Sequence, residues 1–542
     1  MNILSGRIRG SLRGDVYGGL TAAVVALPLA LAFGVASGAG ALSGLYGAIL
    51  VGFFAAVFGG TPSQVSGPTG PMTVVMAATI TQFSHDPALA FTVVMLGGVL
   101  QMLFGFAGIG RFIKLVPYPV VSGFMSGIGC IIIVLQLAAV LGHPMPEGSI
   151  IVKITALPSM FADPQWQTLA LGALSLLIMY LTPRRIARLL PPPLLALIIG
   201  SLVGFLTLKQ APIIGDIPSG LPSPTLPTFS LEHLPEMLQA ALVLAFLGSV
   251  DSLLTSLVAD SLTGTHHKSN RELFGQGLGN LVAGLFGGIP GAGATMRTVV
   301  NVRAGGRTPV SGALHALVLL AVVLGVGSAA RYIPLAVLGG ILLRVGLDII
   351  DWRYIKRAPH APRAGVIIML TTLLLTVIVD LITAVAVGIV MASLLFVKRM
   401  ADVQTQSARL LADSDEASDL SDEESEILKQ ARGRIVLFHM EGPLSFGSAR
   451  DISRMLTTNR EKDVLVVDLG DVPFIDSSAS IALEEAIAAI QREKDIVLLC
   501  GLQARVKDTL KRIGVSDAVP AEHILDSRLD ALRRARALLE QG

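Results

Sequence analysis

The chain has 542 residues, of which 52% are hydrophobic and only 15% are charged, and its mean hydropathy is +0.69. Such a composition excludes a wholly soluble protein and predicts several membrane spans. The formal net charge of +2 gives no sign of a nucleic-acid partner, and two cysteines, Cys130 and Cys500, are too few for a disulfide framework or a cysteine metal cluster.

Apolar stretches long enough to cross about 30 Å of hydrocarbon begin near Val16. The first stretch lacks a small-residue cleavage site and is followed by many similar ones, so we expect a retained span rather than a signal peptide. Two other stretches, at 67–82 and 293–303, are apolar but too short or too rich in Gly and Pro to span alone. With these two, the sequence predicts fourteen membrane segments, at 16–36, 42–59, 67–82, 88–108, 116–141, 166–182, 192–208, 237–259, 272–287, 293–303, 309–328, 333–350, 365–380 and 381–397.

The distribution of basic residues supports that count. If the N-terminus is cytoplasmic, the loops that follow even-numbered segments hold most of the arginines and lysines, as expected for cytoplasmic loops. The loops on the other side hold little more than Lys153, Lys209 and Arg331. We therefore expect a multi-pass protein of the cell inner membrane, embedded in the lipid bilayer, with a cytoplasmic N-terminus.

The two short segments contain a similar pattern of glycine and proline residues. Residues 59–71 contain Gly-Gly-Thr-Pro followed by Ser-Gly-Pro-Thr-Gly-Pro, and residues 287–295 contain Gly-Gly-Ile-Pro followed by Gly-Ala-Gly-Ala-Thr. The segments are third and tenth in order, seven apart, and because seven is odd the two halves have opposite orientations. The sequence thus predicts a polytopic α-helical protein with a 7+7 inverted repeat, at about 14–208 and 236–398, and a transport site where the repeats meet. Two unrelated Gly/Pro kinks are the alternative.

The composition changes after Phe396. Residues 1–400 are predicted to form the transmembrane domain, residues 401–431 an acidic linker, for which a short helix is the alternative, and residues 432–542 a cytoplasmic α/β domain. Its expected strands are 435–440, 464–469 and 496–499, and its expected helices are 447–457, 477–493, 503–513 and 527–540.

The broken segments are candidates for an anion site. A helix that starts inside the membrane presents backbone N–H groups with partial positive charge, which suit an anion. Thr69 stands before one expected start, and Ala294 with Thr295 stands at the other. The hydroxyls and amides there are predicted to hold a small oxyanion; the alternative is a pair of threonine caps without a ligand.

Asp251 lies within an apolar segment, where a carboxylate is costly and therefore a functional candidate. Thr255, four residues later, shares its helical face. Together with freed backbone carbonyls they offer hard oxygen ligands suited to Na⁺. Two other interpretations stay open, in which Asp251 carries a proton or pairs with Arg297, which is itself placed to hold the anion.

Nothing in the sequence indicates an enzyme. No Gly-x-x-x-x-Gly-Lys-[Ser/Thr] motif for ATP is present, so transport must draw on an ion gradient. The glycines at 275, 277 and 279 follow no strand and favour close helix packing over dinucleotide binding. We expect no catalytic residue and no cofactor, with Na⁺ as the coupling ion.

These residues resemble a known family. The stretches 65–69, 260–280 and 474–478 are similar to those of the SulP (sulfate permease) family with its C-terminal STAS domain. The resemblance covers nearly the whole chain. It implies core and gate domains that move as an elevator, and a homodimer aided by the STAS domain.

Within that family, residues 27–34, 248–255 and 291–295 look most like the BicA-type, sodium-dependent bicarbonate transporter branch. The resemblance implies that Na⁺ is held by five residues and that Thr69 and the facing helix start hold bicarbonate. Arg297 departs from this branch and is commoner in sulfate and dicarboxylate transporters and anion exchangers. The residues expected to hold Na⁺ are Asp251, Thr255, Gly293, Ala294 and Thr295.

The same resemblance implies a regulatory serine. Ser478 matches the serine that is phosphorylated in STAS domains related to anti-sigma-factor antagonists, although Ala479 replaces the usual glycine after it. A structural helix N-cap is the alternative role for Ser478.

The sequence therefore favours Na⁺-coupled uptake of bicarbonate. It leaves open H⁺-coupled sulfate or C4-dicarboxylate symport, anion exchange, a channel, and a sensor whose output is the C-terminal domain.

Overall fold

The computed structural model describes residues 2–113, 116–146, 148–187, 190–207, 211–215, 224, 226–326, 331–379, 381–407, 409–411, 420–446, 454, 463–493, 495–515 and 518–541. They form two compact units, Met1–Val390 and Met391–Gly542, and each is described by itself.

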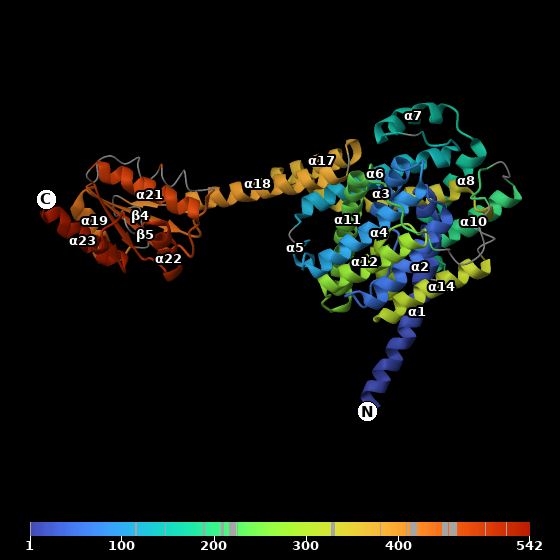
Figure 1. Ribbon diagram of the computed structural model, residues 1–542, viewed down its shortest axis with the longest axis horizontal. Coiled ribbons are helices and arrows are strands. Elements are labelled where there is room, and N and C mark those ends of the chain that lie inside the picture. The colour runs from blue at the N-terminus through green and yellow to red at the C-terminus, as the bar shows by residue number, and fades with distance from the viewer. Residues whose placement is uncertain are drawn as a thin grey trace. The chain divides into compact units, whose positions relative to one another are not determined.

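Each of the fourteen predicted membrane segments coincides with a helix (Figure 1). The short third and tenth segments are α3 and α13, with 13 and 9 residues. In the described part of the chain, 6 helices are long and apolar enough to cross a membrane. The elements of the first half are α1 (Asn2–Ala36), α2 (Ala41–Phe58), β1 (Ser66–Gly67), α3 (Gly70–Gln82), α4 (Pro87–Phe106), α5 (Gly110–Ile113), α6 (Tyr118–Leu141), α7 (Ile150–Ala162), α8 (Trp166–Leu181), α9 (Arg184–Ala187) and α10 (Pro192–Leu206).

The second half repeats this order. The connecting helices α5, α9 and α16 were not predicted, because they are too short for a hydropathy signal. The apolar helix α7, with 13 residues, was also not predicted. The elements are α11 (Leu234–Thr263), α12 (Ser269–Leu285), β2 (Ala292–Gly293), α13 (Thr295–Arg303), α14 (Pro309–Val326), α15 (Leu335–Ile349), α16 (Trp352–Arg357), the 3₁₀ turn η2 (Ala358–His360), α17 (Arg363–Ile378) and α18 (Leu381–Ser407).

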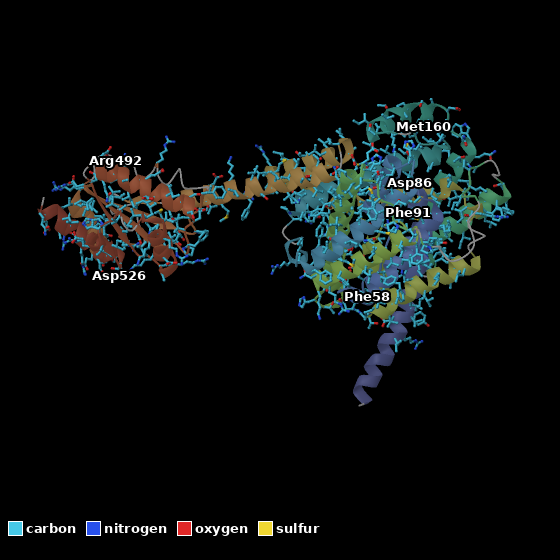
Figure 2. The ribbon with its side chains drawn as sticks, in the orientation of Figure 1. Phe58, Asp86, Phe91, Met160, Arg492 and Asp526 are labelled. Atoms are coloured by element: carbon cyan, nitrogen blue, oxygen red, sulfur yellow. The ribbon has the colours of Figure 1, made fainter. Side chains whose placement is uncertain are left out.

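Local sequence sets many helix ends. Asp86, labelled in Figure 2, caps α4, where its carboxylate accepts a 3.0 Å hydrogen bond from the Ala88 N–H, and Pro87 starts the helix. Gly142 and Gly264 end α6 and α11 with φ of +86° and +69°, a left-handed conformation that glycine adopts without a steric cost.

The membrane helices pack in two groups. In one, α12 packs against α2 and α4, α14 against α1 and α2, and α11 against α4. In the other, α6 packs against α15 and α17, and α8 against α10 and α15. The helices α1 and α3 connect the groups, since both contact α15. This grouping matches the core and gate domains that the family resemblance implies.

Glycines on α12 let its neighbours approach closely, as the sequence predicted. A Cβ atom on Gly277 would lie 2.5 Å from the Gly98 carbonyl oxygen of α4, and one on Gly275 would lie 2.4 Å from the Gly59 nitrogen. One on Gly279 would lie 2.9 Å from a Cα atom of α2. These distances are shorter than real Cβ contacts, so α12 can lie between α2 and α4 only with glycine at these positions.

The second unit contains a five-stranded sheet in the order β3-β4-β5-β6-β7, in which β3 is antiparallel and the others are parallel. Apart from Arg454, the predicted helix at 447–457 lies outside the described residues. The elements are β3 (Arg409–Leu411), α19 (Asp422–Ala431), β4 (Ile435–Glu441), β5 (Val464–Asp471), α21 (Ser477–Arg492), β6 (Ile496–Cys500), α22 (Ala504–Ile513), the 3₁₀ turn η5 (Ala521–His523), β7 (Ile524–Leu525) and α23 (Arg528–Gln541).

The linker boundary predicted at 401–431 differs from the structure. The helix α18 continues to Ser407, β3 pairs with β4, and α19 packs with α23 in the core of the domain. The acidic first turn of α19 gives this segment the composition of a linker. Its buried face, however, carries Ile427 and Leu428, which have 1% and 0% exposure. The other face of the sheet is covered by α21 and α22.

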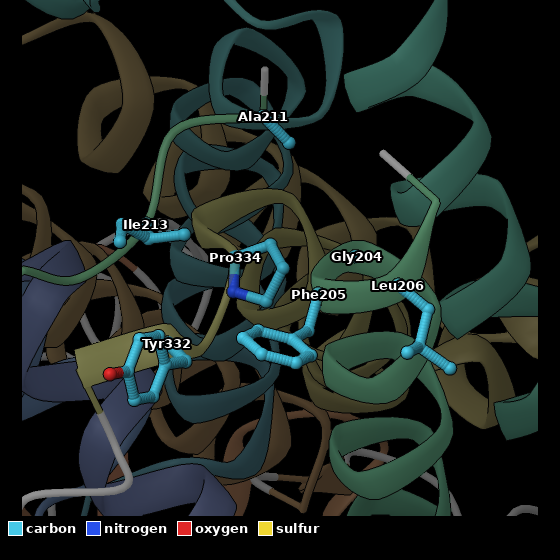
Figure 3. Close-up of a pocket in the computed structure, with 7 residues that line it drawn as sticks. All are labelled: Gly204, Phe205, Leu206, Ala211, Ile213, Tyr332 and Pro334. Atoms are coloured by element: carbon cyan, nitrogen blue, oxygen red, sulfur yellow. The ribbon is translucent and has the colours of Figure 1, made fainter. Parts of the chain in front are cut away.

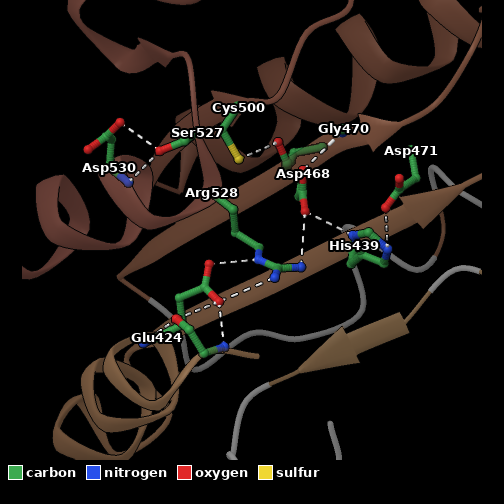
Figure 4. A network of polar contacts seen from close by, with 11 residues as sticks. Glu424, His439, Asp468, Gly470, Asp471, Cys500, Ser527, Arg528 and Asp530 are labelled. Carbon is green, nitrogen blue, oxygen red and sulfur yellow. Dashed lines mark hydrogen bonds and ion pairs between the residues drawn. The ribbon is translucent and has the colours of Figure 1, made fainter. Parts of the chain in front are cut away.

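A network of charged side chains connects the helices α19 and α23 to the strands β4 and β5 (Figure 4). Arg528 of α23 binds Glu424 of α19 through Nε at 2.9 Å and lies 3.6 Å from Asp468 of β5. His439 of β4 lies 2.9 Å from Asp468 and 3.5 Å from Asp471. The hydrogen bond to Asp468 raises the pKa of His439 above its ordinary value.

We expect the domain to lose stability as pH rises through the pKa of His439. A histidine whose pKa is raised by folding contributes fully below the unfolded pKa of about 6.5 and loses its contribution at higher pH. His439→Gln should lower the unfolding free energy of residues 409–541 by about 1–2 kcal/mol at pH 6 and by less at pH 8. Denaturant titration at both values measures this, with His523→Gln, outside the network, as control. An equal loss at both pH values would contradict the assignment.

The second prediction concerns helix packing. Gly277→Ala should push α12 away from α4 and lower stability by on the order of 1–3 kcal/mol, because the added methyl has no space. Gly325→Ala on α14 is the matched control, since no atom of the described residues lies within 4 Å of the Cβ position there. Thermal unfolding of the detergent-solubilised protein distinguishes the two, and equal midpoints would refute the close contact.

Candidate functional site

The two interrupted segments cross each other, as the sequence predicted. β1 and β2 pair antiparallel, with Ser66 opposite Gly293 and Gly67 opposite Ala292. The Ala294 N–H donates to the Val65 carbonyl at 2.9 Å. An antiparallel pair of this kind is expected where two halves of opposite orientation meet. The helices α3 and α13 start directly after the crossing.

Glycine is required at the crossing. Gly67 has φ of +149°, and a Cβ atom there would lie 2.5 Å from Nη1 of Arg297. Gly291 faces the backbone of Gly67, where a Cβ would lie 2.6 Å from the carbonyl carbon. A Cβ atom on Gly293 would lie 2.3 Å from Nε2 of Gln64. The repeated glycines in both motifs therefore reflect close backbone approach.

The helix α12 holds both segments through one face. Glu272 accepts from the N–H groups of Gly60 and Thr61, both at 2.8 Å. Gln276 donates to the Ser66 hydroxyl, and Asn280 exchanges hydrogen bonds of 2.8 and 3.0 Å with the Gly291 N–H and carbonyl. Sequence reasoning missed these residues, although polar side chains spaced by four inside a span were a usable signal.

Three of the predicted Na⁺ ligands lie together. The Thr255 hydroxyl of α11 donates to the Gly293 carbonyl at 2.9 Å and lies 2.7 Å from the Thr295 hydroxyl. The Gly293 N–H donates to Ser252 at 3.0 Å, which fixes the peptide. Ala294 is the N-cap residue of α13, between Gly293 and Thr295. The predicted set is thus assembled from α11, β2 and the start of α13.

Asp251 faces the other half of the molecule. Its carboxyl lies beside the Thr69 hydroxyl. Oδ2 of Asp251 and the Thr69 hydroxyl are both buried and lie close enough to interact, but neither atom makes a well-aligned hydrogen bond with any described residue. Thr69 is the N-cap residue of α3, but its side chain makes no capping hydrogen bond, so a purely structural cap does not explain it. A buried carboxylate oxygen without a donor is available to a cation.

Arg297 does not neutralise Asp251 in the described part of the chain. It is 1% exposed, and its Nη2 donates to the Pro68 carbonyl at 2.8 Å. Its Nη1 has no partner there. Arg297 therefore places a positive charge at the backbone just before α3, and the salt-bridge interpretation of Asp251 is not supported.

His315 was not singled out from the sequence. It has 0% exposure on α14, and neither ring nitrogen has a partner among the described side chains. A Cβ on Gly52 would lie 3.2 Å from its Nδ1 and 3.1 Å from the Ser66 carbonyl oxygen, so His315 packs behind the crossing.

A hollow of about 360 Å³ lies away from this site (Figure 3). It is mainly apolar and contains none of the predicted site residues. Because the polar crossing carries the unpartnered groups, we place the functional site there and not in the hollow. The hollow is lined by Gly204, Phe205, Leu206, Ala211, Ile213, Tyr332 and Pro334.

The N-cap of α21 differs from the prediction for Ser478. The cap is Asp476, whose carboxylate accepts from the Ala479 N–H at 2.8 Å. Ser478 lies in the first turn and is exposed. A capping role for Ser478 is therefore wrong, because the aspartate two residues earlier already occupies that position.

Comparison with known proteins agrees with this architecture. The chain is 46% identical over 503 residues to the bicarbonate transporter BicA of Synechocystis sp., covering 92% of this chain and 89% of that protein. The solved transmembrane domain of a cyanobacterium bicarbonate transporter BicA is 52% identical, with a TM-score of 0.66, covering 69% of this chain and 97% of that one. The structure of SLC26A9, 19% identical, has a TM-score of 0.83 and covers 98% and 92% of the two chains, which shows a shared fold.

Family models account for both units. The Sulfate permease family matches residues 12–372, and the STAS domain matches residues 426–531. The helices around the crossing and the five-stranded domain are thus the two parts of one known architecture. The chain is a multi-pass membrane protein that belongs to the sulfate permease family and carries a C-terminal STAS domain.

Proposed function

We propose that this chain is a secondary active transporter that carries bicarbonate into the cell together with Na⁺. Membership of the sulfate permease family and the named activity of the bicarbonate transporter relatives support the anion. One observation carries the sodium part. The Thr255 hydroxyl joins the Gly293 carbonyl and the Thr295 hydroxyl, one helical turn from the unpartnered carboxylate oxygen of Asp251.

The proposed Na⁺ site uses hard oxygen ligands. Asp251 supplies negative charge, the hydroxyls of Thr255 and Thr295 supply neutral oxygens, and Gly293 supplies a carbonyl outside helical hydrogen bonding. The carbonyl of Ala294 also accepts the first helical hydrogen bond of α13, from the Thr298 N–H at 2.9 Å. Na⁺ favours such oxygens, and unwound backbone beside a half-helix is where transporters coordinate it. A bound cation would also offset the cost of burying the Asp251 carboxylate.

The proposed anion site lies between the starts of α3 and α13. Their first N–H groups carry partial positive charge, and the hydroxyl of Thr69 can donate to an oxyanion. Arg297 adds a full positive charge at Pro68. A monovalent oxyanion is thereby held with little need for other charged side chains.

Charge explains the coupling. An unneutralised Asp251 would repel the anion: two unit charges about 5 Å apart at an effective dielectric constant of about 20 interact by roughly 3 kcal/mol. This is more than a hundredfold in affinity, so bound Na⁺ decides whether bicarbonate binds. We further propose that the group containing α2, α4, α11 and α12 moves as an elevator against the group containing α6, α8 and α15.

The proposed function also implies a membrane location, an oligomeric state and a regulatory position. We propose that the protein lies in the cell inner membrane, with its N-terminus and STAS domain cytoplasmic, and that it forms a homodimer through the STAS domain. Exposed Ser478 is the proposed regulatory phosphorylation position. We assign no catalytic residue and no cofactor.

Proteoliposome uptake tests the main proposal. Labelled bicarbonate, sulfate and fumarate are each supplied with and without a sodium gradient. Wild type should accumulate bicarbonate in a sodium-dependent manner, and Asp251→Asn should lose about tenfold or more of the sodium stimulation because the cation loses its charged ligand. Asp86→Asn, which changes an exposed acid, should behave as wild type. Bicarbonate uptake that is indifferent to sodium would remove the proposal.

Buried Arg297 favours a second candidate, H⁺-coupled symport of sulfate or a C4-dicarboxylate. An added positive charge suits a dianion, and in that case Arg297→Ala should abolish uptake driven by external acid. Under the main proposal, Arg297→Ala weakens bicarbonate binding by roughly three- to thirtyfold but leaves sodium dependence intact. Obligatory exchange would mark an anion exchanger, and currents above carrier turnover would mark a channel.

A further inference from the structure

Glu272 is a buried carboxylate whose hydrogen-bonding capacity is filled. It is 1% exposed, and Oε2 accepts from two backbone N–H groups. Oε1 accepts from the side-chain amides of Gln64 and Gln276, both at 2.8 Å. Four donors stabilise the charge without a cation among the described side chains. Its oxygens are committed to protein donors, which suits a positioning role rather than ion binding.

Gln64 connects Glu272 to the proposed Na⁺ site. Its Nε2 donates to Glu272, and its Oε1 lies 3.0 Å from the Ser256 hydroxyl, which shares its one hydrogen between Gln64 and the Ser252 carbonyl at 2.9 Å. Ser256 follows Thr255 on α11. The Gln64 amide also lies under Gly293, where a Cβ atom would be 2.3 Å from Nε2. One buried amide therefore contacts both the helix and the peptide that supply Na⁺ ligands.

The orientation of the Gln64 amide depends on Glu272. A glutamine amide has one accepting and one donating end. Because Glu272 accepts hydrogen bonds, the Nε2 group of Gln64 points toward α12. The Oε1 atom of Gln64 therefore points toward Ser256. In Glu272→Gln one oxygen becomes an NH₂ group that meets two donors, so the amide of Gln64 loses its orientation or its contact.

We propose that Glu272 and Gln64 are positioning residues that set the spacing between Thr255 and Gly293 and thereby the affinity for Na⁺. This rests on the sodium site of the proposed function. The residues touch neither ion, yet they fix two elements that must coordinate it together. If the Gln64 amide loses its orientation, Na⁺ binding should weaken more than transport slows at saturating Na⁺.

Binding of radioactive sodium to the purified full-length protein in detergent tests the idea without transport. Glu272→Gln should raise the Na⁺ concentration for half-saturation by about tenfold, and Ser256→Ala, a smaller change, by about threefold. The swap of Gln64→Glu with Glu272→Gln should recover part of the affinity, because the 64–272 hydrogen bond reforms with its direction reversed. Glu232→Gln, an exposed position, should bind as wild type.

The outcomes separate the two proposals. If wild type does not bind Na⁺, the sodium site falls and this inference with it. If wild type binds and Glu272→Gln and Ser256→Ala bind equally well, only the positioning role is refuted. A variant with lower thermal stability but wild-type affinity also refutes it, since that is the result of a purely structural role.

Discussion

The structure depends on one constraint: inside a bilayer, every backbone N–H and carbonyl needs a partner from the protein. Two chain segments give up helical hydrogen bonding at membrane depth. They remain tolerable because β1 and β2 pair with each other and because α12 supplies side-chain partners for Gly60, Thr61 and Gly291. The first N–H groups of α3 and α13 lie beside this pair, and the proposed anion site uses them.

The charged residues around the crossing are separated rather than paired. Asp251 lies beside Thr69, whereas Arg297 binds the Pro68 carbonyl. A direct ion pair would have satisfied both charges internally and left little reason for an external ion to bind. Neither charge is neutralised by the other, which suits the proposed transport of a cation together with an anion.

Hydropathy predicted the membrane segments, and the repeated Gly/Pro pattern predicted that the two interrupted segments meet. Both features can be read from short stretches of sequence. The clustering of Thr255 with Gly293 and Thr295 was expected only from the family resemblance. Other features depended on contacts distant in sequence. Glu272 looked like part of a polar turn until the fold placed Gly60 against it. The acidic composition of α19 left a linker and a short helix open, and only the fold shows that this helix belongs to the core of the domain. A capping role was considered for Ser478, but Asp476 provides the cap.

The two halves contribute unequally to the site. The proposed sodium ligands come from α11, β2 and α13 of the second half, whereas Thr69 before α3 comes from the first. The β1–β2 pair joins these contributions through backbone hydrogen bonds, and α12 holds both strands from one face. A displacement of the Gly293 peptide must therefore move Ser66 and the start of α3. The proposed sodium and anion ligands are thus mechanically one unit, and we expect occupancy of one position to alter the geometry of the other without any longer pathway through the protein.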